Sequence, residues 1–166
     1  NKSIELVYAG LPAQNRIGRR GKGSVRRISP IVTNIGSVDY ADMPYAISAC
    51  DLIASNYRVG SANWGGSRHV LEAASCGIPI LTGDFSVRKE QLGDDYPLFW
   101  PWQENDGRIS NTAEKIMLEH ICGLIDNPRK KVEIGEKLVE RMKRYSAEAV
   151  GKRLESEIKT LLRKRR

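Results

Sequence analysis

Short apolar runs that alternate with helical patterns are the feature that most constrains the fold of this chain. The runs cover residues 4–9, 31–36, 51–56 and 78–83, and a shorter one, "PLFW", ends at Trp100. They are continuous apolar stretches rather than alternating apolar and polar residues, as is typical of strands buried on both faces. The chain is therefore predicted to be α/β, with a Rossmann-like, doubly wound parallel sheet.

Helical patterns separate these runs and continue to the C-terminus. Ser67 is placed to cap a helix over 67–76, and Gly77 follows where a helix end favours a residue with positive φ. A helix is also predicted over 40–50, and a turn or short helix over 87–92. Further C-terminal helices are predicted to begin at Ser110 or Asn111, at Asn127-Pro128 and at Ser146.

Length and composition are those of an ordinary globular domain. The chain has 166 residues, of which 40% are hydrophobic and 28% charged, so residues 1–166 are predicted to form a single domain. No apolar run approaches the roughly 18 residues of a membrane-spanning helix, and the N-terminus does not resemble a signal peptide. Because the chain opens without Met, we expect it to be a fragment of a longer protein.

Cysteine and histidine are sparse and scattered. Cys50, Cys76 and Cys122 lie far apart in apolar contexts, so they are predicted to be buried, reduced thiols of a cytoplasmic protein. His69 and His120 have no partner at the spacing of metal ligands. We therefore expect no metal site.

Positive charge is concentrated rather than evenly spread. The net charge is +7, and segment 10–29 holds basic residues without an acidic one, while the chain ends in "RKRR". Such segments predict an anionic partner: a phosphorylated ligand, nucleic acid or an anionic membrane surface. A solvated basic loop without a dedicated ligand is the alternative. The residues considered as phosphate contacts are Arg16, Arg19, Arg20 and Lys22.

A glycine-rich segment precedes the helix predicted over 67–76. The crevice at the carboxyl ends of parallel strands is the usual ligand site, and the amides of a helix N-terminus favour phosphate. Gly65 and Gly66 have no side chains that would hold a ligand away from this backbone. Glu72 lies inside the helix, and its carboxylate can accept hydrogen bonds from the vicinal hydroxyls of a ribose. A solvent-facing glutamate without a ligand is the alternative.

The stretch "GGSRHVLEAASCGIPIL" (65–81) resembles the signature of retaining GT-B glycosyltransferases of the group 1 type. In that family a glycine-rich turn precedes a helix reading L-E-A-x-A-x-G-x-P. The resemblance extends over roughly residues 31–145, through "IGSVDYADMPYAISACDLIASNY" on one side and "GDFSVRKEQLG" on the other. It implies that the chain is the C-terminal, donor-nucleotide half of a two-domain enzyme whose N-terminal domain binds the acceptor.

The resemblance also implies roles for individual residues. Glu72 matches the glutamate that binds the ribose hydroxyls of the nucleotide sugar. Gly36 and Val38 would lie beside the nucleobase, and Glu90 matches an acidic position in the loop after the fourth strand. The turn whose amides face the phosphates and the donor sugar corresponds to Gly65, Gly66, Ser67 and Arg68.

Two departures from the family pattern concern the donor site. Trp64 stands eight residues before Glu72, where the family has a glutamate that contacts the donor sugar. Its indole would stack on a sugar or base face, or pack against the partner domain. The family's diphosphate-binding Arg and Lys follow the first strand of this domain, and we expect this chain to begin at the second. The basic segment 16–27 would then face donor phosphate, an anionic lipid surface or a lipid-linked acceptor.

Together these features predict a cytoplasmic glycosyltransferase domain, peripheral at the membrane, that acts in polysaccharide or glycolipid biosynthesis. Its substrate is a UDP- or GDP-type sugar, and neither a cofactor nor a catalytic residue is identified. A GT-B epimerase or phosphorylase would keep the fold and change the chemistry. A nucleic-acid-binding module is the alternative of another class, although no aromatic stacking platform is interleaved with the basic segment.

Overall fold

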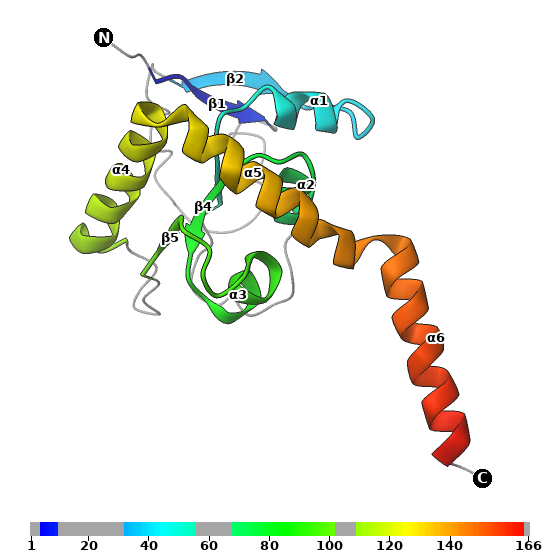
Figure 1. Ribbon diagram of the computed structural model, residues 1–166. Helices are drawn as coiled ribbons and strands as arrows, with labels where there is room; N and C mark the ends of the chain where they lie inside the picture. Colours follow the sequence, from blue (N-terminus) through cyan, green and yellow to red (C-terminus); the bar gives the residue numbers. More distant parts are fainter. Residues whose placement is uncertain (1–3, 10–31, 56–67, 102–108, 165–166) are drawn as a thin grey trace, which may run out of the picture. The chain divides into compact units, whose positions relative to one another are not determined.

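The computed structural model describes residues 4–9, 32–55, 68–101 and 109–164 (Figure 1). The chain divides into two compact units, residues 1–46 and residues 47–166, and each is described by itself. That all 166 residues form one domain remains a prediction.

The first unit contains a parallel pair of strands, β1 (Leu6–Ala9) and β2 (Val32–Gly36). The register shifts by one residue at Ala9, whose partner is Gly36. Gly36 has a φ of 76°, in the left-handed region that favours glycine. Val7 and Ile35 are about half exposed, at 51% and 48%. Coverage of this pair on both faces remains a prediction.

The second unit is built on the parallel sheet β3 (Ile53–Ser55), β4 (Ile80–Gly83) and β5 (Phe99–Trp100), with β4 in the middle. Every residue of β4 is buried, as the unbroken apolar run predicts. Along the chain, α2 (Arg68–Ser75) connects β3 to β4, and α3 (Ser86–Leu92) follows β4 and precedes β5. The helix α1 (Met43–Ser48) spans the boundary between the two units.

Helix caps define the C-terminal part of the chain. The Ser110 hydroxyl accepts a hydrogen bond from the Ala113 amide at 3.2 Å, and α4 (Asn111–Asp126) begins there. Asn127 caps α5 (Pro128–Met142) by accepting from the Lys130 amide at 3.2 Å. These contacts confirm the predicted starts. A short 3-10 turn, η2 (Lys143–Tyr145), leads into α6 (Ala147–Lys164).

The core of the second unit lies between the sheet, α2 and the C-terminal helices. Tyr96 contributes to it through its buried hydroxyl, which accepts a hydrogen bond from the Ile80 amide at 2.7 Å. Burial raises the pKa of Tyr96 above its usual value, so the phenol stays neutral. The apolar residues of this core include Val70, Ala73, Ala74, Ile80, Leu81, Leu92, Leu98, Trp100, Leu124, Ile134, Leu138 and Met142.

The helices α2 and α5 approach each other at two glycines. Gly77 has a φ of 71°, which lets the chain leave α2 and turn toward β4. A Cβ atom built at Gly135 of α5 would lie 2.3 Å from the Gly77 carbonyl oxygen, far inside van der Waals contact. Only a glycine at position 135 permits this approach.

We expect Gly135→Ala to lower the free energy of unfolding by about 1–3 kcal/mol, because the added methyl group forces backbone atoms apart. The matched control is Gly123→Ala in α4, where a Cβ atom meets nothing within 4 Å. Alanine favours a helix by up to about 1 kcal/mol over glycine, so the control is expected to be neutral or stabilising. Urea titration of both variants checks this, and equal midpoints would contradict it.

Cysteine burial differs from the prediction. Cys122 is exposed, and Cys50 and Cys76 are only partly covered, although all three are free thiols. Cys122 stands two residues before the buried Leu124, which places it about 200° round α4 and so on the opposite face. Its apolar neighbours in the sequence lie on other faces of the helix, so they do not indicate that Cys122 itself is buried.

The helix α6 has no buried residue although its sequence is amphipathic. Leu154, Ile158, Leu161 and Leu162 are 55–61% exposed. Their spacing places them on one side of the helix, and we call them the α6 stripe. No helix in the described ranges is long and apolar enough to cross a membrane.

The double substitution Leu154→Ala and Ile158→Ala is expected to change the free energy of unfolding of this chain by less than about 0.5 kcal/mol, as for other exposed sites. Leu138→Ala in the core of α5 is the contrast and is expected to cost about 2–5 kcal/mol. Thermal or urea unfolding distinguishes the two. A large loss in the α6 variant would show that the stripe is covered within this chain.

Candidate functional site

The carboxyl ends of β3 and β4 define the edge of the sheet where a ligand is expected. Ser55 ends β3 and lies beside Thr82 of β4 in the parallel register. Both side chains are buried, and the Thr82 hydroxyl has no hydrogen-bond partner among the described residues. The helices α2 and α3 begin after these strands, so their N-termini belong to the same edge.

Glu72, the fifth residue of α2, occupies a place consistent with a ligand contact. The buried face of the helix consists of Val70, Ala73 and Ala74, and Glu72 lies outside that face. The residue is partly exposed, yet its Oε1 atom is shielded from solvent and has no hydrogen-bond partner among the described residues. A shielded carboxylate oxygen without a donor is unfavourable. A group that donates hydrogen bonds would relieve it.

The other predicted site residues belong to α2, to α3, to the unit of residues 1–46 or to segments outside the described ranges. Arg68 is exposed at the start of α2. Glu90 is exposed on α3, and its carbonyl oxygen accepts hydrogen bonds from Arg141 Nη2 at 3.0 Å and from the Tyr145 hydroxyl at 3.1 Å. Gly36 and Val38 are partly exposed and belong to the unit of residues 1–46. Trp64, Gly65, Gly66, Ser67, Arg16, Arg19, Arg20 and Lys22 lie outside the described residues.

A polar network at this edge is absent from the sequence-based prediction. His69 Nε2 lies 2.9 Å from Ser55 Oγ, and Arg88 Nη2 donates to the same oxygen at 3.3 Å. Arg88 is 1% exposed, donates through Nη1 to Gln91 Oε1 at 2.6 Å, and lies over the Phe85 ring. We call Ser55, His69 and Arg88 the β3–α2–α3 network.

The network perturbs the ionisation of His69. His69 as a whole residue is exposed, but part of its imidazole ring is covered where it contacts Ser55. This desolvation and, second, the charge of Arg88 lower the pKa of His69 below 6.5. The imidazole is therefore neutral at pH 7. One feature of the sequence could have indicated this network: Ser55 ends an apolar run, and residues at the carboxyl ends of parallel strands lie at the edge of the sheet where ligands bind.

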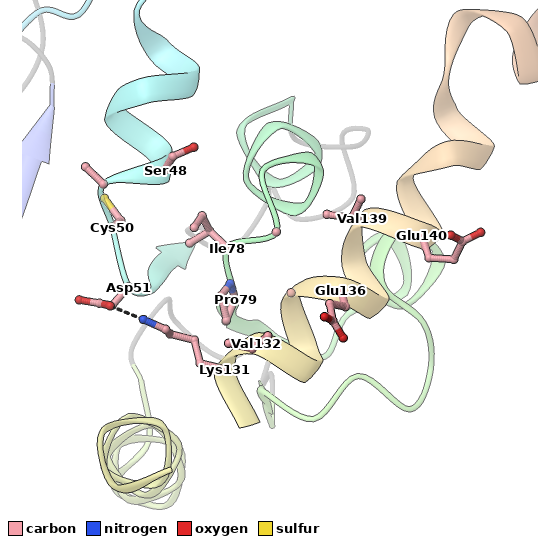
Figure 2. A pocket seen from close by; sticks show the side chains of 13 residues that line it. Ser48, Cys50, Asp51, Ile78, Pro79, Lys131, Val132, Glu136, Val139 and Glu140 are labelled. Atoms are coloured by element: carbon pink, nitrogen blue, oxygen red, sulfur yellow. Dashed lines mark hydrogen bonds and ion pairs between the residues drawn. The ribbon is translucent and has the colours of Figure 1, made fainter. Parts of the chain in front are cut away.

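A surface groove lies at the other edge of the sheet. It has a volume of about 540 Å³ and is bounded by the links that precede β3 and β4 and by α5. Figure 2 shows the ion pair between Lys131 and Asp51 at its rim, together with Val132 and Val139 of α5. Because these links are at the amino ends of the strands, the groove is distinct from the predicted donor site.

Metal ligation finds no support in the described part of the chain. No group of three or more His, Cys, Asp or Glu side chains there is arranged to hold a metal ion. The Nε2 atom of His120, one of the two histidines, lies 2.9 Å from the Phe99 carbonyl oxygen.

Comparison with known proteins supports the fold. No protein-family model matches the chain, and no curated protein matches it. Among solved structures, HepE of Anabaena, crystallised in complex with UDP, superposes with a TM-score of 0.54 at 18% sequence identity. The match covers 78% of this chain and 32% of HepE. The likeness confirms the predicted fold, a Rossmann-like α/β unit with C-terminal helices.

Proposed function

We propose that this chain is the C-terminal, nucleotide-sugar-binding domain of a retaining GT-B glycosyltransferase of the group 1 type. The observation that carries the proposal is Glu72 Oε1, which is shielded and has no hydrogen-bond partner among the described residues. Glu72 stands in a stretch that resembles the family signature, on a helix that follows β3. The similar fold of HepE, solved with UDP, adds support for a nucleotide ligand.

The proposed chemistry follows from the groups at the strand ends. A ribose diol would donate hydrogen bonds to the Glu72 carboxylate and supply the missing partner of Oε1. The diphosphate would lie at the N-terminus of α2, where backbone amides and the helix dipole favour negative charge, with Arg68 beside it. Catalysis would then come from positioning the donor and stabilising the diphosphate leaving group, without a protein nucleophile.

A second domain is part of this proposal. The α6 stripe is an exposed apolar surface of the kind that marks an interaction site. We propose that the acceptor-binding part of the enzyme covers it. The acceptor would be an intermediate of polysaccharide or glycolipid synthesis, and the basic segment 16–27 would meet an anionic membrane surface or a lipid-linked acceptor on the cytoplasmic side. No cofactor is proposed.

Titration with UDP tests the donor site. We expect this chain to bind UDP, and Glu72→Ala to weaken the binding about 10- to 100-fold, because hydrogen bonds to a charged acceptor are lost. Glu119→Ala, an exposed glutamate on α4, is the matched control and is expected to bind as the wild type does. Isothermal calorimetry with UDP, GDP and ADP measures the affinities and identifies the base.

The same experiment separates the alternatives. Unchanged UDP affinity in Glu72→Ala would refute the ribose contact, and a chain that binds none of the nucleotides would refute the proposed function. Salt-dependent binding of single-stranded RNA in place of nucleotides would favour a nucleic-acid-binding module.

A further inference from the structure

We propose that the β3–α2–α3 network positions the first turn of α2, and with it Glu72, for nucleotide binding. Ser55, His69 and Arg88 are the positioning residues. The inference rests on the proposed function, because it assigns a task to residues that would not themselves touch the nucleotide.

The direction of the hydrogen bonds follows from the chemistry of the three side chains. A guanidinium has donors only, so Ser55 Oγ accepts from Arg88 Nη2 at 3.3 Å. The Ser55 hydroxyl is buried, at 3% exposure, and its own proton needs an acceptor. Of the two partners that the described part of the chain gives this hydroxyl, His69 Nε2, at 2.9 Å, is the one that can accept. The network therefore runs from Arg88 through Ser55 to a neutral His69.

Two neighbouring side chains contact Arg88 at the donor end of this network. Arg88 is 1% exposed and is fixed by its hydrogen bond to Gln91 and by the Phe85 ring beneath it. These contacts set the orientation of the Arg88 guanidinium relative to Ser55. The same contacts reduce the free-energy cost of burying the charged guanidinium.

The network joins three elements at the expected ligand edge. Ser55 ends β3, His69 is in the first turn of α2, and Arg88 is on α3. His69 stands three residues before Glu72, close to one helical turn. A shift of the first turn of α2 would displace the Glu72 carboxylate, and hydrogen-bond geometry tolerates only small displacements.

Acid is expected to break the network. A protonated His69 has no lone pair at Nε2 for the Ser55 hydroxyl and would place a second cation near Arg88. Arg88 is the charged group brought against His69 from α3, β3 contributes the neutral Ser55, and α2 itself carries Arg68 and Glu72. Because the folded pKa of His69 is lowered, the network is intact at pH 7 and is lost as the pH falls below 6.5.

The test measures UDP affinity of the chain by calorimetry from pH 8 to pH 5 in the wild type, His69→Gln and His69→Leu. Glutamine offers a carbonyl oxygen that accepts from Ser55 and does not ionise in this range. His69→Gln is expected to bind as the wild type does at pH 8 and to keep more of its affinity at pH 5. His69→Leu is expected to bind about 2- to 10-fold more weakly at every pH.

The comparison with His69→Gln removes other titrations, because the UDP phosphate and every side chain other than residue 69 are common to both proteins. Where GDP or ADP binds more tightly than UDP, that nucleotide replaces UDP in the test; if the wild type binds none of the three, the proposed function fails and the positioning role fails with it. If the wild type binds UDP but His69→Gln has the same pH profile, only the positioning role is refuted. Normal affinity in His69→Leu refutes it equally. Should His69→Leu not fold, the profile of His69→Gln decides.

Discussion

The close contact between α2 and α5 is the constraint on which the candidate site depends. The backbone of α5 at Gly135 approaches the Gly77 carbonyl so closely that a methyl group would overlap it. Gly77, with its positive φ, turns the chain from α2 toward the central strand β4. The C-terminal end of α2 is thus fixed by backbone atoms, which have fewer conformations than side chains and tolerate little displacement.

Glu72 lies between two such anchors. The glycine contact holds the end of α2, and the hydrogen bond between His69 and Ser55 holds its beginning, with Arg88 fastening Ser55 to α3. In a helix of eight residues held at both ends, a side chain near the middle has a defined position. Glu72 Oε1 is shielded and has no hydrogen-bond partner among the described residues, which is costly in the protein alone.

Local signals predicted the elements well, because their physics is local. Ser110 and Asn127 cap helices through amides three residues further on, and Gly77 ends α2 through its own φ, so each can be recognised from neighbouring letters. Burial is different. Cys122 lies in an apolar context and is exposed, whereas Arg88 lies in a charged context and is buried. Which face of a helix is covered depends on elements distant in the sequence.

The sequence by itself determined the α/β class, the order of strands and helices, and the position of Glu72 on the helix that follows β3. Only the tertiary structure decided that Ser55, His69 and Arg88 meet and that Glu72 Oε1 is shielded. The reason is distance along the chain. Ser55 is separated from His69 by 14 residues and from Arg88 by 33, so their contact depends on sheet register and helix packing rather than on any local pattern.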